Sequence, residues 1–150
     1  MIIYGNCSPR WGIYVGNYDG KRKGRGTMTF KNGDIYNGEW VNDKMNGEGI
    51  MTYTNGDVYN GYWDNNQMVE GVMRYRNGNV YNGFWDDNEI NGGGIMKYAN
   101  GDVYSGQWEY GMYEEEGIMK YANGDVFDGL WKNGKWKNVI LKMENVGSFY

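Results

Sequence analysis

Carboxylates are the side chains in this sequence with the widest chemical repertoire. The 150 residues include 19 Asp and Glu, no His and one Cys. Without His, a Ser-His-Asp triad, a Cys-His pair and a zinc site on His are excluded, and Cys7 alone forms neither an internal disulfide nor a thiolate cluster. Paired carboxylates acting as general acid and base are the arrangement that composition leaves open. They fall at expected hairpin tips and exposed strand positions, with no closed pocket to raise a pKa, so we predict no catalytic residue and no cofactor.

An acidic column recurs along the chain and could suggest a metal site. Its members are Asp34, Asp57, Asp102 and Asp125. In a sheet, successive copies would lie two strands apart, about 9.6 Å, which is too far to share an ion whose ligand distances are about 2.4 Å. We therefore expect these residues to close turns, and we predict no metal site.

A compact basic cluster stands near the start, at Lys21, Arg22, Lys23 and Arg25. Such a loop could contact anionic lipid headgroups, each residue adding about 1 kcal/mol near a charged membrane. The alternative is a solvated hairpin tip. The whole chain has a net charge of −4 and a pI of about 4.8, so it lacks the basic footprint of a nucleic-acid-binding protein, and we predict no such partner.

A repeat of 22 or 23 residues determines where these charged side chains lie. It uses most of the 26 Gly and of the 26 aromatic residues (15 Tyr, 7 Trp and 4 Phe). In each repeat a ring is followed two residues later by Gly and two after that by a second ring. Further on in the first five repeats come Gly, Met and another ring at the same spacing of two, and then Asn-Gly. The sixth repeat fades after Trp131. The six repeats start at Tyr14, Tyr36, Tyr59, Tyr81, Tyr104 and Phe127.

A spacing of two is typical of β-strands, so each repeat is predicted to form two short strands with the marked residues on one face. Asn-Gly is the strongest short hairpin signal and joins consecutive repeats. Keeping Tyr53 and Tyr59 on one face favours a three-residue loop, Thr54-Asn55-Gly56. With Gly56 in the left-handed conformation, this loop pairs Met51 with Tyr59.

Glycines inside the predicted strands are expected to make room for the rings. Gly is a poor strand former, but it offers no side chain to block a neighbouring ring. The simplest register within a repeat pairs Trp40 with Gly49, Gly38 with Met51 and Tyr36 with Tyr53.

The predicted fold is all-β: an elongated, single-layer antiparallel meander of tandem β-hairpins with about twelve strands. Residues 14–136 hold the six repeats, and residues 1–13 and 137–150 break the pattern and are expected to cap the ends. Val139–Met143 alternates like a capping strand, with a short helix as the alternative. No basic segment followed by a long apolar stretch opens the chain, and no run could cross a bilayer, so we expect a soluble, cytoplasmic protein, with peripheral membrane association as a variant.

The repeat resembles the MORN (membrane occupation and recognition nexus) family. The matching residues are Asp34-Ile35-Tyr36-Asn37-Gly38-Glu39-Trp40, then Gly47-Glu48-Gly49 and Tyr53-Thr54-Asn55-Gly56. The third and fifth repeats depart from Gly-x-Gly, with Val69-Glu70-Gly71 and Glu115-Glu116-Gly117. The resemblance implies an array of hairpins that acts as a protein-binding scaffold, a membrane-junction tether or an accessory module of enzymes such as lipid kinases.

The function we predict is a non-enzymatic scaffold for protein–protein interaction, whose partner the sequence does not identify. A homodimer through a terminal strand is one form of such an interaction. The alternative function is peripheral membrane or phosphoinositide binding through the basic cluster. Rings dominate interface hot spots, so one face of the sheet is a candidate partner groove, although the same rings could simply form the core. The groove residues would be Tyr36, Trp40, Tyr59, Trp63, Tyr81, Trp85, Tyr104 and Trp108.

Overall fold

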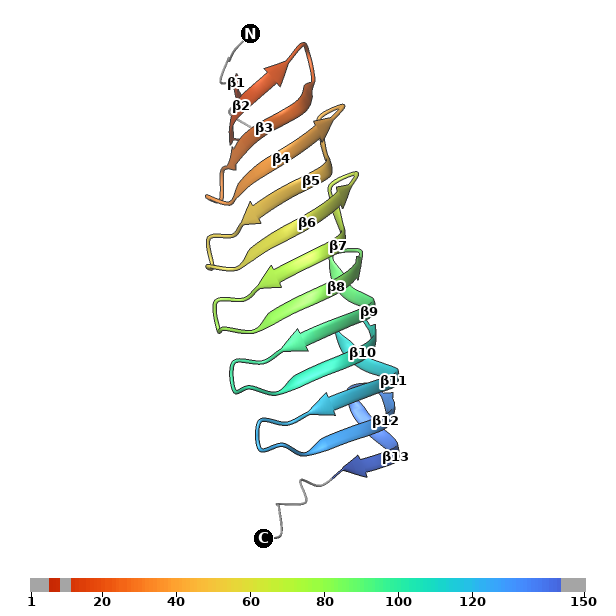
Figure 1. The fold of residues 1–150 in the computed structure, drawn as a ribbon. Coiled ribbons are helices and arrows are strands. Elements are labelled where there is room, and N and C mark those ends of the chain that lie inside the picture. The colour runs from red at the N-terminus through yellow and green to blue at the C-terminus, as the bar shows by residue number, and fades with distance from the viewer. Residues whose placement is uncertain (1–5, 9–11, 144–150) are drawn as a thin grey trace. The chain divides into compact units, whose positions relative to one another are not determined.

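The computed structural model describes residues 6–8 and 12–143, and the side chains of residues 12–137. Every regular element among these residues is a β-strand, which confirms the all-β prediction. The strands divide into two units between residues 76 and 77, and consecutive strands in each unit follow chain order (Figure 1). Unit 1 contains β1 (Asn6–Ser8), β2 (Gly12–Tyr18), β3 (Arg22–Phe30), β4 (Ile35–Val41), β5 (Lys44–Thr52), β6 (Val58–Asp64) and β7 (Gln67–Arg74). Unit 2 contains β8 (Val80–Asp86), β9 (Glu89–Lys97), β10 (Val103–Glu109), β11 (Met112–Lys120), β12 (Val126–Lys132) and β13 (Lys135–Met143).

Both predicted caps extend beyond the described residues. Val139–Met143 lies in β13, which pairs antiparallel with β12, so this segment is a strand and not the alternative short helix. Residues 1–5, 9–11 and 144–150 lie outside the description. A capping function for residues 1–13 and 137–150 therefore stays a prediction.

The turns between repeats have the predicted three-residue form. The Tyr53 N–H donates to the Asp57 carbonyl at 2.9 Å, and the Gly56 N–H donates to the Tyr53 carbonyl at 3.0 Å. Gly56 has a φ of 96°, a conformation that a side chain would strain. Met51 consequently pairs with Tyr59, which confirms the predicted register between repeats.

The register within a repeat was predicted wrongly, because the turn inside each repeat is tighter than expected. Asn42 and Asp43 both adopt left-handed backbone, with φ of 49° and 70°, and form a two-residue turn of type I′. Short Asx side chains tolerate this conformation, so no glycine marks the turn in the sequence. The observed pairs are Tyr36 with Met51, Gly38 with Gly49 and Trp40 with Met45.

The two glycines of Gly-x-Gly have different structural roles. A Cβ on Gly49 would collide with the ring of Tyr36, so this glycine makes room for the ring as predicted. The preceding Gly47 has a φ of 101° and lies where the register shifts between Gly38 and Trp40. Glu115 takes the Gly47 position in the fifth repeat and keeps a left-handed φ of 53°.

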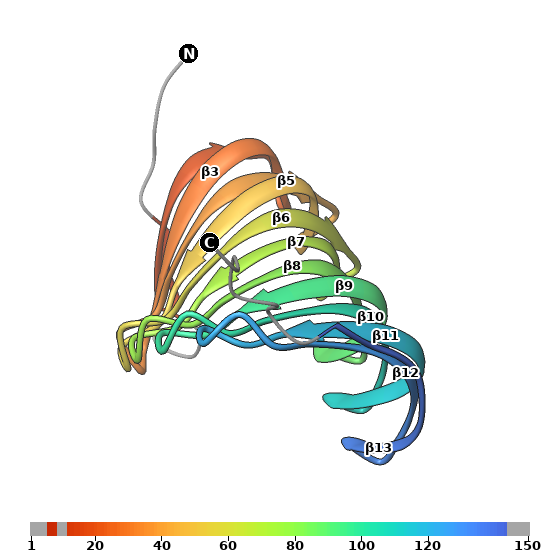
Figure 2. The ribbon, with the colours of Figure 1, turned by 60° about the horizontal axis from the view of Figure 1, so that its bottom comes forward.

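The core lies on one face of the bent strands. A single-layer sheet has no second layer to cover it, so it buries a face by curving around it. Figure 2 shows the strands of each unit bent into arcs. The buried side chains alternate with exposed ones along each strand, as in β4, where Tyr36, Gly38 and Trp40 are buried and Asn37 is exposed. We call the buried side the inner face and the other the outer face.

Candidate interaction surface

The eight rings of the predicted partner groove all lie on the inner face, in the core. Their side chains retain between 0% and 8% of their exposure, so a partner would find very little of their surface. Within each unit the structure brings these residues together, but as the packed core of the alternative interpretation. They are Tyr36, Trp40, Tyr59 and Trp63 in unit 1, and Tyr81, Trp85, Tyr104 and Trp108 in unit 2.

Edge-to-face packing and hydrogen bonds fix each ring. Tyr36 meets Trp40 of its own strand at a centroid distance of 5.2 Å and Trp63 of the next repeat at 5.4 Å, both nearly perpendicular. The Trp40 Nε1–H donates to the Gly26 carbonyl at 3.1 Å, and the Tyr36 hydroxyl donates to the Glu39 carbonyl at 3.0 Å. Burial raises the pKa of Tyr36 to about 12. These rings are therefore structural and rigid.

A second set of rings is open to a partner, and the sequence analysis did not single it out. These rings, which we call the rim rings, come two residues after the strand methionines, just before each Asn-Gly turn. All are partly exposed, and Tyr121 retains 37% of its exposure. The sequence feature that could have identified the rim rings is the third recurrent ring of each repeat. The rim rings are Phe30, Tyr53 and Tyr75 in unit 1, and Tyr98 and Tyr121 in unit 2.

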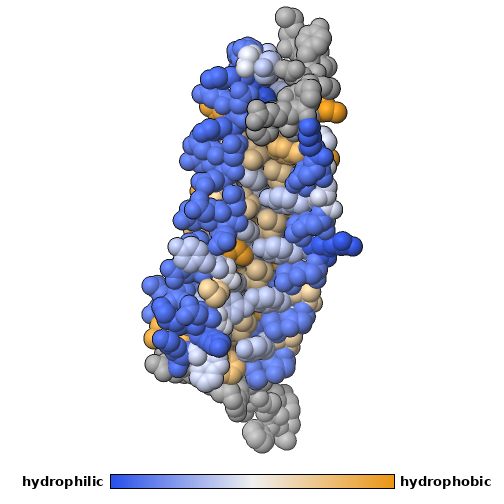
Figure 3. All heavy atoms as spheres, turned by 180° about the vertical axis from the view of Figure 1, so that it is seen from behind, coloured by the Kyte–Doolittle hydropathy of each residue, from blue (hydrophilic) through white to orange (hydrophobic). Residues whose placement is uncertain are grey.

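One rim ring of unit 1, Phe30, lines a depression. A hollow of about 360 Å³ is lined by Phe30, Lys31, Asn32, Asp34 and Met51. Met51 is 6% exposed and belongs to the buried methionine column. Figure 3 shows pale and tan side chains on this side of the sheet, between hydrophilic side chains along the two edges.

Tyr53, the middle rim ring of unit 1, has a partly desolvated phenol. Burial raises its pKa, and the Asp34 and Asp57 carboxylates raise it further. Within the described part of the chain its hydroxyl makes no hydrogen bond, in contrast with the hydroxyls of Tyr36 and Tyr59. It is therefore available as a donor to a ligand.

The rim of unit 2 differs, because one rim ring is tied to the core. The hydroxyls of Tyr98 and Tyr113 are hydrogen-bonded to each other. Tyr113 stacks on Tyr104 with a centroid distance of 4.0 Å, and burial raises the pKa of Tyr113. Tyr121 packs edge-on against Phe127 at 5.6 Å.

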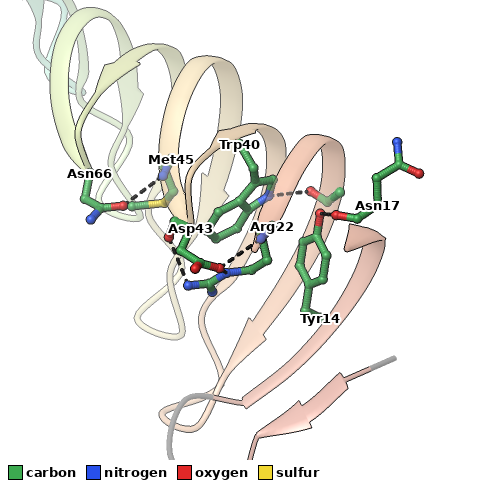
Figure 4. Close-up of polar contacts among 8 residues, drawn as sticks. Tyr14, Asn17, Arg22, Trp40, Asp43, Met45 and Asn66 are labelled. Atoms are coloured by element: carbon green, nitrogen blue, oxygen red, sulfur yellow. Dashed lines mark hydrogen bonds and ion pairs between the residues drawn. The ribbon is translucent and has the colours of Figure 1, made fainter. Parts of the chain in front are cut away.

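The basic cluster is not a free loop, since three of its four side chains pair with carboxylates. Arg22 opens β3, donates to Asp43 through its backbone N–H (2.9 Å) and its Nε (3.1 Å), and lies over Trp40 at 4.4 Å from the ring centroid (Figure 4). These bonds from Arg22, the backbone one foremost, hold the pKa of Asp43 below its usual range. Lys23 pairs with Asp19.

Arg25 and Lys21 complete the cluster. On the outer face, the Arg25 Nη2 lies 3.6 Å from both the Glu39 Oε1 and the Glu48 Oε2. Lys21 is exposed in the turn before β3. The four basic residues thus lie among several acidic groups and do not form a purely cationic patch.

The acidic column closes turns and links each turn to the next. The Asp34 Oδ1 accepts a bond from the Thr54 N–H at 2.8 Å, one repeat further on, and its Oδ2 accepts one from Asn32 at 2.7 Å. Asp57 and Asp102 accept in the same way from Arg76 and Ala122, both at 2.8 Å. Among the residues that the structure describes, no cluster of three ligating side chains could hold a metal ion.

The buried carboxylate of Glu114 in unit 2 is also structural. Glu114 accepts from the Lys132 ammonium at 2.7 Å and from the Asn133 N–H at 2.9 Å, and the Lys132 bond is the main reason that the pKa of Glu114 is lowered. A general acid would need a raised pKa. No helix that could span a membrane occurs in the described ranges.

These features define a tandem β-hairpin repeat protein with a closed aromatic core and partly exposed rim rings. The MORN repeat pattern matches residues 18–35, 36–58, 59–80, 81–103 and 104–126. The chain therefore belongs to the MORN repeat family, as its sequence resemblance implied. MORN repeats are non-enzymatic and are known to interact with proteins and membranes.

Solved structures share the fold at low sequence identity. One is the TCP domain of SAS-4 (dCPAP) from Drosophila melanogaster, in complex with a proline-rich motif of Ana2 (dSTIL). It is 17% identical, with a TM-score of 0.53, and the match covers 83% of this chain and 70% of that one. A comparison with curated protein sequences finds no match.

Proposed function

We propose that this protein is a non-enzymatic scaffold that binds a segment of a partner protein along its inner face. The row of rim rings in unit 1 carries the proposal. Phe30, Tyr53 and Tyr75 are partly exposed on a face where Tyr36, Trp40, Tyr59 and Trp63 are buried, so a partner can touch them there. Tyr18, which takes the Trp40 position in the first repeat, is also 46% exposed. Aromatic side chains supply much of the binding energy at protein interfaces.

Rigidity supports the same role. The rim rings stand on strands held by interlocked Tyr and Trp side chains and by the Asp bonds between turns. A preformed site loses little conformational entropy on binding, which favours affinity. The SAS-4 TCP domain, which shares the fold, was solved with a proline-rich motif, and a protein segment is therefore the class of partner that we propose.

Affinity purification from the native cells, followed by mass spectrometry, tests this function. The bait is the full chain, compared with the variant Tyr53→Leu on the inner face and the variant Tyr62→Leu on the outer face, where Tyr62 is 50% exposed. We expect a partner that is enriched with the wild type and with Tyr62→Leu, and is depleted with Tyr53→Leu. Absence of any enriched protein, together with a monomer in light scattering, would refute the scaffold.

A further inference from the structure

The spacing of the rim rings in unit 1 specifies the conformation of the segment that fits them. Phe30, Tyr53 and Tyr75 occur once per repeat, which is once every two strands. Neighbouring strands are about 4.8 Å apart, so successive rim rings are about 9.6 Å apart and the three rings span about 19 Å. The row runs across the strands.

A polyproline II helix matches this spacing. It rises about 3.1 Å per residue with three residues per turn, so every third residue faces the same side at intervals of about 9.3 Å, and six residues cover about 18.6 Å. In a β-strand the third residue along faces the opposite side. An α-helix brings position i+7 near the same face at about 10.5 Å, which over two intervals overshoots the row by about 2 Å.

The surface between the rings also suits prolines. The depression beside Phe30 is lined by Phe30 and Met51 together with polar side chains of the neighbouring turn. Grooves lined by aromatic side chains are how proteins bind proline-rich segments. The backbone carbonyls of polyproline II are not bonded within the helix, so they need outside donors. Among the residues that the structure describes, none is hydrogen-bonded to the Tyr53 hydroxyl, and Lys31 and Arg76 are exposed at the turns beside Phe30 and Tyr75.

We propose that the rim rings of unit 1 bind a polyproline II segment of a partner protein that carries proline at every third residue. The segment lies across the strands, with one proline beside each of Phe30, Tyr53 and Tyr75. The Tyr53 hydroxyl donates to one of its carbonyls. This inference rests on the proposed scaffold function and names the chemistry of its partner.

Calorimetry on the full chain with synthetic peptides tests the proposal. The probe has four Pro-Ala-Gln triplets with blocked ends, and its control has the same composition with prolines spaced alternately by two and by four residues. A third peptide is an amphipathic helix with leucines at positions i and i+7. We expect the triplet peptide to bind at least tenfold more tightly than either control. Equal binding of the two proline peptides, tighter binding of the helix, or no binding at millimolar peptide would overturn the proposal.

Three variants assign the binding to the rim rings. Tyr53→Leu removes the ring and should weaken binding by about tenfold, in the range of a hot-spot ring. Tyr53→Phe removes only the hydroxyl and should weaken it about threefold, as expected for one hydrogen bond. Tyr62→Leu, on the outer face, should bind like the wild type. Urea unfolding verifies that each variant is folded, and unchanged affinity in a folded Tyr53→Leu would refute the site.

The two proposals fail in different ways. If the triplet peptide does not bind but affinity purification still recovers a partner that is sensitive to Tyr53→Leu, the scaffold function stands and the polyproline II inference is wrong. If neither experiment detects an interaction, both are wrong.

Discussion

At the scale of single residues, the glycines beneath the tyrosine rings set the strictest steric limit in the fold. A Cβ on Gly49 would lie 2.3 to 2.5 Å from ring and hydroxyl atoms of Tyr36, and that ring is packed against Trp40 and Trp63, so a ring shift cannot easily relieve an added methyl group. Gly93 is also a strand glycine, but a Cβ there would meet nothing nearer than the Gln107 Nε2 at 3.7 Å. The repeat already separates the two in the sequence, because Gly49 stands two residues before a strand methionine and Gly93 does not.

We predict that Gly49→Ala lowers the free energy of unfolding by about 3 kcal/mol, the upper part of the range for overpacking. Gly93→Ala is its matched control and should change that free energy by less than about 0.5 kcal/mol. Urea denaturation followed by tryptophan fluorescence measures both. Equal effects of the two substitutions would show that the rings do not depend on the glycines beneath them.

The Asp43 carboxylate is predicted to make the stability of the fold depend on pH. Its pKa is lowered in the folded protein by hydrogen bonds from Arg22, foremost that of the backbone N–H. A lowered pKa stabilises the fold at pH values above the ordinary Asp pKa of about 3.9, and this stabilisation is lost as the pH falls through the lower folded-state value. The Asp43 side chain is 40% exposed, so screening keeps the contribution below about 1 kcal/mol.

The variant Asp43→Asn isolates this charge, because Asn66 makes the equivalent bond to the Met45 N–H at 2.8 Å in the next repeat. We expect wild type to exceed Asp43→Asn in stability at pH 7, and the difference to shrink as the pH falls below 4. Urea unfolding of both proteins at several pH values measures it. A difference that is constant with pH would mean that the charge of Asp43 does not contribute.

At the scale of elements, the sequence predicted the strands and one of the two turn types. Asn55-Gly56 predicts a turn, because glycine adopts left-handed backbone without strain. The requirement that the rings on both sides of the turn share one face then favours a loop of three residues. Asn42-Asp43 forms a left-handed turn without glycine, and the register prediction therefore failed there. The core rings were predicted as a group. Burial distinguishes them from the rim rings, and burial depends on how the sheet curves, which period-two patterning does not specify.

The basic cluster at the start of β3 is predicted not to bind anionic membranes. Arg22, Lys23 and Arg25 each pair with at least one carboxylate. We expect no more protein to float with phosphatidylserine-rich vesicles than with neutral vesicles at physiological salt. Replacing Glu39 and Glu48 together by Gln frees Arg25 and raises the local charge by two, which should increase flotation. Salt-sensitive flotation of the wild type with anionic vesicles would restore the lipid hypothesis.

At the scale of the whole molecule, stability in such a repeat is a sum of local terms. Each strand of a unit pairs only with its neighbours in sequence, and the ring contacts link a repeat to the next one along. In proteins built this way, damage to one repeat weakens its neighbours most and loses effect with distance.

We therefore predict that Gly49→Ala speeds amide hydrogen exchange mainly in β4, β5 and β6, and leaves the protection of β10–β12 close to that of the wild type. Mass spectrometry of deuterated peptides measures both regions in one experiment, and Gly93→Ala again serves as the control. Phe30 ends β3, and Tyr53 and Tyr75 directly follow β5 and β7, so the same substitution should also weaken binding of the proline-triplet peptide. Uniform loss of protection in both regions would mean that the chain unfolds as one cooperative body, and the local reasoning would then fail.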